Sequence, residues 1–282
     1  MDEHSEKAKL REAIVSGIFY PEEGGELEAI VGKLLAANRP KRGGAKAIVA
    51  PHAGFRYSGD LAALAWNAAE GRKIGTVCIL APMHRPYDDL VYLPESDFFD
   101  GPFGAVRVDT DIVEEMMDCG TLFRRNDIPH FEEHGIELQL PFMRAICPNA
   151  GLVPVILGAS APAAVRALAA ALDLVLAERK GDALIVVSSD LATGSSSGPS
   201  GDAAATAAAD RFLEKVEARD WRSMTAAEGQ ATGACGAGCL AAFLASSLAE
   251  GTRTELLGRH DSSAFRESAD ERLVQYAALA YY

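Results

Sequence analysis

The sequence predicts a single α/β domain, residues 1–282, in which helices flank a mainly parallel or mixed central sheet. Three short apolar runs, 45–50, 74–80 and 182–188, have the composition of buried strands. Segments of helical composition separate them, and this alternation favours a sheet covered on both faces. The chain shows no internal repeat, and its Gly/Ser-rich stretch at 194–201 suits an active-site loop better than a linker between domains.

Six segments have the composition of helices, and three of them carry local signals. Asp109 or Thr110 can cap the second, because their side-chain oxygens accept bonds from first-turn amides. Pro162 suits the first turn of an alanine-rich helix. Pro141 instead predicts an interruption or an early boundary. The predicted helices are 60–70, 109–119, 135–146, 161–179, 203–218 and 236–248.

Two further segments complete the expected sheet. Residues 151–157 read as a strand, and Pro154, which has no N–H to donate, suggests a sheet edge or a bulge there. Residues 273–282 fit either a strand or a helix, because periodicity alone does not decide between them.

Composition restricts the partners that the protein can have. A formal net charge of −13 argues against binding nucleic acid or an anionic membrane surface, since both need a basic face. The charged start lacks the apolar core of a signal peptide, and no apolar run reaches the roughly 18 residues that span a bilayer. Five cysteines without a CxxC pair favour reduced thiols in the cytoplasm. We therefore expect a soluble cytoplasmic protein.

Polar side chains follow three of the predicted strands. His52 comes after the first strand and His84 after the second, each beyond a proline, and the third leads into Asp190. In open α/β sheets, ligands bind beyond the carboxyl ends of the strands. These three strand ends are therefore expected to converge on one edge of the sheet.

Two neutral imidazoles are good ligands for iron, zinc or copper. His52 and His84 would then need a third ligand, and four candidates remain open at this point. The alternative is that each histidine bonds to backbone at a strand end. The candidate third ligands are Cys235, Asp190, Glu137 and His134.

The segment 132–137 is dense in titratable groups. On a helix, His134 and Glu137 would share a face, because they are three residues apart. Such a pair could bind metal or act as a general base with its orienting partner. The alternative is a solvated helix start whose acids complement the helix dipole.

Cys235 lies among glycine and alanine residues at the start of a predicted helix. Small neighbours allow close backbone approach, and a helix start favours the thiolate that binds metal or acts as a nucleophile. The alternative is a small buried hydrophobe, which is the role expected for Cys239.

Several common catalytic motifs are missing from the sequence. There is no GxGxxG after a strand, no Walker loop and no GxSxG elbow. The serines at 188, 189 and 195–197 invite a serine-hydrolase interpretation, but Ser/Gly clusters are usually loops.

Six blocks in order resemble the Memo family, whose microbial members are often called AmmeMemoRadiSam system protein B. The most specific is APHAGFRYSG, and EHGIELQLP resembles the family's EHSIE-x-x-LP block. The blocks are SGIFYP at 16–21, APHAGFRYSG at 50–59, LAPMH at 80–84, EHGIELQLP at 133–141, VSSDL at 187–191 and the Cys235–Gly236 pair.

The resemblance implies a fold like that of class III extradiol dioxygenases, with cysteine replacing a glutamate ligand. It implies His52, His84 and Cys235 as metal ligands, and Fe(II) as the first choice of metal with copper or zinc as alternatives. Asp190, His134 and Glu137 would line the pocket or support the ligands, as candidate catalytic groups. One departure is Thr193, where relatives often carry a histidine.

The leading hypothesis is non-haem redox or dioxygenase-like chemistry on a small molecule. The alternative is a non-catalytic module that binds metal, a peptide or a partner protein within a modification system. Radical SAM and AMMECR1-like proteins are the partners that the resemblance implies. A weaker alternative is a metal-dependent hydrolase, which would need a metal-bound water and a nearby base.

Overall fold

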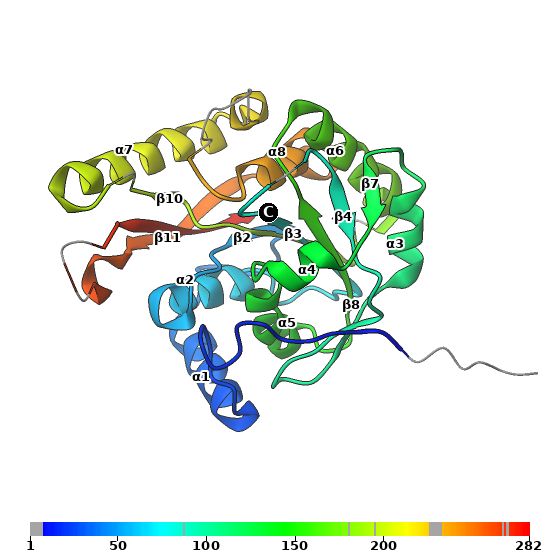
Figure 1. Cartoon of the computed structure of the whole chain (residues 1–282), viewed down its shortest axis with the longest axis horizontal. Coiled ribbons are helices and arrows are strands. Elements are labelled where there is room, and N and C mark those ends of the chain that lie inside the picture. Colours follow the sequence, from blue (N-terminus) through cyan, green and yellow to red (C-terminus); the bar gives the residue numbers. More distant parts are fainter. Residues whose placement is uncertain are drawn as a thin grey trace, which may run out of the picture.

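The structure is a computed structural model, in which a mixed sheet lies between two layers of helices (Figure 1). Four parallel strands form its centre, in the order β2 (Ala47–Ala50), β9 (Ala183–Ser188), β3 (Thr76–Pro82) and β8 (Gly151–Leu157). All four are buried along their whole length, as expected for strands covered on both faces. The described residues are 8–86, 88–179, 181–194, 196–225, 233–266, 268 and 271–282.

Antiparallel strands extend this centre on both sides. β12 (Val274–Tyr281) pairs with β2, so the C-terminal segment is a strand and not a helix. β11 (Thr254–Asp261), which the sequence did not predict, pairs along β12, and β4 (Val91–Leu93) pairs with β8. The predicted mainly parallel or mixed sheet is thus confirmed in its mixed form. The remaining strands are β10 (Ala192–Thr193) and β7 (Phe123–Arg125) in this sheet, and β1 (Leu10–Arg11), β5 (Phe98–Phe99) and β6 (Val106–Arg107) in a small second sheet.

Pro154 lies in β8, which has a neighbouring strand on each side, so the predicted sheet edge or bulge at this residue is wrong. β8 has β3 on one side, where Pro154 faces Ile79 in unbroken register. On its other side, β4 pairs only with residues 156 and 157, and an isolated bridge joins Val108 to Leu152. No described strand residue on that side pairs with Pro154. The missing N–H therefore costs the sheet little at this position.

Helices cover both faces of the sheet (Figure 1). α1, α2 and α5 lie on one side, with α2 against β2 and β12, while α6, α7 and α8 lie on the other, with α8 against β3 and β9. The helices are α1 (Gly24–Ala37), α2 (Phe55–Asn67), α3 (Thr110–Met117), α4 (Ile128–Glu132), α5 (Leu140–Ile146), α6 (Pro162–Leu176), α7 (Gly198–Glu217) and α8 (Ala237–Ala245). Among the described residues, no helix combines the length and the apolar character needed to cross a bilayer.

The local helix signals were largely correct. Asp109 caps α3 by accepting a bond from the Ile112 amide at 3.4 Å, and Pro162 lies in the first turn of α6. The helix predicted at 135–146 is interrupted near Pro141, as expected. A 3₁₀ turn at Glu137–Gln139 comes first, and α5 begins only at Leu140. The expected loop at 194–201 is shorter than predicted, since α7 already begins at Gly198. Ser195 lies outside the described residues.

Candidate metal site

The three polar strand ends meet at one edge of the sheet, as the sequence predicted. β2, β9 and β3 are parallel neighbours, so their carboxyl ends lie side by side. His52, Asp190 and His84 each follow two residues after the last residue of one of these strands. The sheet therefore supplies one wall of a shared site from three separate parts of the chain.

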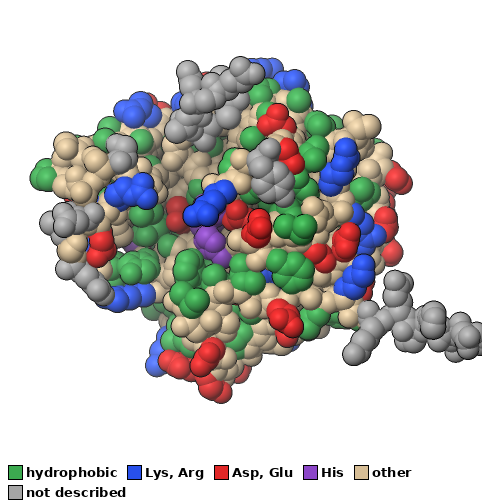
Figure 2. Space-filling model, viewed as in Figure 1, with side chains coloured by type: hydrophobic (Ala, Val, Ile, Leu, Met, Phe, Trp, Pro, Cys, Tyr) green, Lys and Arg blue, Asp and Glu red, His purple; other side chains and the backbone are tan. Residues whose placement is uncertain are grey.

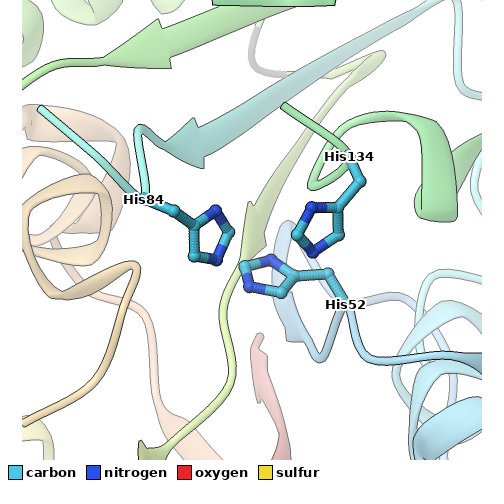
Figure 3. Close-up of side chains that lie close together, drawn as sticks. All are labelled: His52, His84 and His134. Carbon is cyan, nitrogen blue, oxygen red and sulfur yellow. The ribbon is translucent and has the colours of Figure 1, made fainter. Parts of the chain in front are cut away.

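A third histidine enters this site from outside the sheet. His134 lies between α4 and the 3₁₀ turn that precedes α5, and Figure 3 shows its ring facing those of His52 and His84. The ring of His134 stacks on His84 at a centroid distance of 4.8 Å, and its centroid lies 5.4 Å from that of His52. One ligand atom from each histidine lies within 4.8 Å of the others. The residue pattern left His134 open as one of four candidate third ligands, whereas the family resemblance implied a pocket or supporting role for it.

The tautomer of His52 follows from its hydrogen-bond partners. Ser188 Oγ donates its single proton to the Gly135 carbonyl at 2.6 Å and accepts a bond from Gln139 Nε2 at 3.1 Å. His52 Nδ1 lies 2.9 Å from the same oxygen, and it must be the donor because the serine proton is already used. In the neutral form of the ring, the lone pair of His52 is therefore on Nε2, which faces the cavity.

A buried tryptophan fixes the orientation of that network. The indole N–H of Trp66 can only donate, and it does so to Gln139 Oε1 at 2.9 Å. The amide nitrogen of Gln139 consequently faces Ser188 and the Pro51 carbonyl, which it reaches at 3.0 Å. The proton positions at His52 thus follow from the protein core and do not depend on a bound ligand.

His84 is held by a carboxylate in the same manner. Glu133 accepts bonds from both the backbone amide and Nδ1 of His84, each at 2.6 Å. Burial lowers the pKa of His84, but hydrogen bonds to Cys235 and Glu133 outweigh this effect and raise it to about 9. With Nδ1 engaged by Glu133, Nε2 is the atom left for a metal ion. A carboxylate behind an imidazole is the usual support of a metal-binding histidine.

His134 has a different environment. Within the described chain its ring makes no hydrogen bond, and Phe19 packs edge-on against it at 5.1 Å. Burial, followed by the charges of His52, His84 and Arg11, lowers the pKa of His134 to about 3. Because a general base works best with a pKa near the working pH, this favours His134 as a neutral ligand over a role in proton transfer.

Cys235 lies directly beside His52. Its Sγ is 3.1 Å from His52 Nε2 and accepts a bond from the backbone amide of Asp190 at 3.0 Å. Asp190 also accepts the backbone N–H of His52 at 3.0 Å, so its carboxylate anchors the strand end that carries the histidine. The predicted ligands His52, His84 and Cys235 are thus brought to one place, together with His134.

The glycine after Cys235 allows its backbone to approach the end of β9. A Cβ added at Gly236 would lie 2.7 Å from the Ser188 carbonyl oxygen and 2.6 Å from Ser189 Cβ. We expect Gly236→Ala to displace Cys235 and to lower stability by about 1–3 kcal/mol, which urea unfolding would measure. Gly32→Ala is the matched control, because its Cβ would meet nothing within 4 Å in the middle of α1. That variant should gain about 0.5–1 kcal/mol, and equal losses in both would contradict the close approach.

These groups line a cavity of about 600 Å³. Figure 2 shows a histidine at the bottom of the hollow, with basic and acidic side chains at its rim. Thr193 is part of the wall. The volume suits a small molecule. The cavity is lined by His52, His84, His134, Cys235, Asp190, Thr193, Ile18, Phe19, Ala53, Gly54, Tyr57, Ala192, Gly233, Ser262, Glu271, Arg272, Val274 and Tyr276.

Glu137 does not lie in this cavity, which corrects the expectation that it orients His134. The two residues do not share a helix face, because His134 precedes the 3₁₀ turn that carries Glu137. The Glu137 carboxylate is fully buried and accepts bonds from Arg11, Tyr20 and the amides of Ile14 and Val15. Its partners therefore come from the N-terminal part of the chain.

Sequence reasoning missed several residues that support the site. Glu133 was seen only as part of a charged cluster, although its proximity in sequence to His134 was a usable signal. Gln139 and Trp66 carried no signal, because amide and indole groups become informative only once their partners are known. Arg11 lies more than a hundred residues from the carbonyls that it contacts.

The residues present fit a metal ion. Nδ1 of His52 and Nδ1 of His84 are each engaged by a buried partner, which leaves Nε2 of both rings as the atom that could bind a metal ion, and a thiol lies beside the first of them. The 3.1 Å between His52 Nε2 and Cys235 Sγ agrees with two neighbouring ligands of one ion, whose bonds are about 2.1 Å and 2.3 Å long. Imidazole and thiolate together suit iron, copper or zinc, and exclude magnesium and calcium as preferred ions.

Comparison with known proteins adds independent information. The family model described as Memo-like protein matches residues 11–280. A MEMO1 family protein of Thermotoga maritima is 32% identical over 195 residues, which cover 64% of this chain and 69% of that protein. One of Methanothermobacter thermautotrophicus is 28% identical over 285 residues, 96% and 100% of the two chains. The structure of an uncharacterized Escherichia coli protein aligns with 83% of this chain and 98% of its own, at 11% identity and a TM-score of 0.40.

Proposed function

The chain belongs to the Memo-like protein family, and on that premise we propose that its cavity binds a redox-active metal ion, with Fe(II) preferred over copper or zinc. The observation that carries the proposal is the bonding of the two imidazoles. His52 and His84 each have Nδ1 engaged by a buried partner, which leaves Nε2 of both rings to face the cavity. That arrangement matches the support that metal-binding histidines receive in proteins.

We propose His52, His84 and Cys235 as the ligands, with His134 as the competing third donor. A bound Fe(II) ion with two imidazoles and one anionic ligand would supply open positions for oxygen and a small-molecule substrate. The protein's own residues then have separate tasks. Ser188 and Glu133 hold the two imidazoles, and the Asp190 carboxylate anchors the His52 backbone beside the cavity.

Metal titration of protein purified without oxygen tests this proposal. One equivalent of Fe(II) per chain is expected, and its binding should be followed by calorimetry together with metal analysis. Cys235→Ser should weaken binding more than His134→Gln if the thiolate is the third ligand. The reverse order would replace Cys235 by His134 in the ligand set. A wild-type protein that takes up none of Fe(II), Cu(I), Cu(II) or Zn(II) would refute the site altogether.

Oxygen uptake with catechol-like compounds separates an enzyme from a binding module. Dioxygenase-like chemistry predicts uptake that depends on both metal and substrate. A non-catalytic module that binds metal, a peptide or a partner protein predicts tight metal and no uptake on a broad panel. One observation favours this second function: burial lowers the pKa of His134 to about 3, which disfavours a role for it in proton transfer.

A further inference from the structure

We propose that Arg11, which is not part of the cavity wall, is a positioning residue that sets the orientation of His84 and His134. It does so through residues 130–137, called here the 130–137 segment. The proposal rests on the metal site proposed above and extends it to the N-terminal part of the chain.

The three donor groups of Arg11 all go to this one segment. Nε donates to the His130 carbonyl at 2.8 Å, Nη2 to the Glu133 carbonyl at 2.9 Å, and Nη1 to the Glu137 carboxylate. The Arg11 side chain is 1% exposed, so none of these bonds competes with water. A planar guanidinium holds its three acceptors in fixed mutual positions, which a lysine ammonium cannot do.

Glu137 binds the same segment to the chain around residues 14–20. Its carboxylate accepts bonds from the amides of Ile14 at 2.9 Å and Val15 at 3.0 Å, and from the Tyr20 hydroxyl at 2.7 Å. We call the Arg11, Glu137 and Tyr20 side chains the Arg11–Glu137 clamp. A buried ion pair is weak evidence for a gain in stability, because removing two charges from water costs much of the attraction between them. A role in fixing the position of the segment accounts for its presence better.

The 130–137 segment carries two groups of the site. Glu133 accepts bonds from the backbone amide and from Nδ1 of His84, and the His134 ring stacks on His84 with an angle of 16° between the planes. Arg11 donates to the backbone carbonyl of Glu133, the residue whose carboxylate holds His84. A displacement of this backbone would therefore move the carboxylate that holds His84, together with the adjacent His134. His52 has a different anchor on the opposite side, the Asp190 carboxylate.

A double-mutant cycle on metal affinity tests this route. Arg11→Lys keeps the positive charge but loses the planar guanidinium and its fixed donor geometry. It should weaken Fe(II) binding about 10- to 100-fold, as expected when the support of a ligand is lost. Combined with Glu133→Gln, it should add little further loss, because both changes act through the same carboxylate. Combined with Asp190→Ala, the two losses should multiply. Arg39→Lys, in an exposed pair with Glu70, is the matched control and should change nothing.

A readout without metal separates this proposal from the metal site itself. In the metal-free wild type, the His84 Nδ1 proton bonded to Glu133 should give a low-field NMR signal that shifts in Arg11→Lys at temperatures well below its melting point. This test remains valid even if the wild type binds no metal. Tyr20→Phe loses only one bond of the clamp, so it provides a milder variant if Arg11→Lys does not fold.

Either of two results would overturn the role of Arg11. One is an unchanged signal and metal affinity in Arg11→Lys despite a lower melting temperature, which would make Arg11 purely structural. The other is equal coupling of Arg11→Lys to Glu133→Gln and to Asp190→Ala, which would mean that its effect spreads through the whole fold. Tyr20→Phe must show the same pattern of coupling at a smaller amplitude.

Discussion

A protein in which alanine replaces His52 should bind Fe(II) at least about 100-fold more weakly than the wild type. Losing a residue that merely supports a ligand costs about 10- to 100-fold, so losing the ligand itself should cost more. His52 is the most buried of the three cavity histidines, and its Nε2 lies beside the Cys235 sulfur. Any metal-dependent oxygen uptake should disappear with the metal. Calorimetric titration under nitrogen, with metal analysis of the recovered protein, measures the effect.

His260→Ala is the matched control for this experiment. His260 is partly buried and, like His52, has a hydrogen-bond partner, Asp60 at 2.9 Å, but it lies on β11 and is not part of the cavity wall. Its replacement should leave Fe(II) affinity within a few fold of the wild type. Wild-type affinity in both His52→Ala and His260→Ala would place the metal elsewhere, whereas a similar loss in both would indicate general damage to the fold.

Removing the Glu137 carboxylate should destabilise the protein by about 3–5 kcal/mol, the cost of leaving one member of a buried ion pair unpaired. In Glu137→Ala, the guanidinium of Arg11 would remain buried with one acceptor missing, and the Tyr20 hydroxyl would lose its 2.7 Å partner. Urea unfolding should show the full change. Thermal unfolding should show a fall of roughly 10 °C, given the usual scaling for a chain of this size.

A surface ion pair provides the comparison for Glu137. Glu70 and Arg39 lie 2.7 Å apart with more than half of each side chain exposed, and such pairs contribute about 0–1 kcal/mol. Glu70→Ala should therefore have almost no effect on unfolding. A loss below about 1 kcal/mol in Glu137→Ala would show that water reaches the clamp and screens its charges.

The sheet and the cavity could be predicted from the sequence because both depend on local signals. Short apolar runs identified the four central strands, and the parallel arrangement followed from the helices between them. His52, His84 and Asp190 could be placed together because each directly follows such a strand. The partners of Glu137 could not be foreseen, because hydrogen bonds to residues 14, 15 and 20 depend on how two distant segments pack. The same holds for Glu133, whose neighbour His84 is 49 residues away.

The pairing of β2 with β12 has a consequence for the order in which the chain assembles. Residue 47 pairs with residue 281, and the other neighbour of β2 is β9, so neither flank of this strand is available early in synthesis. Contacts between residues this far apart in sequence form slowly, and an apolar strand is prone to aggregation until it is paired. His52 directly follows β2. Its partners Ser188 and Cys235 lie 136 and 183 residues further along the chain, so the proposed metal site can form only after both distant segments have been synthesised.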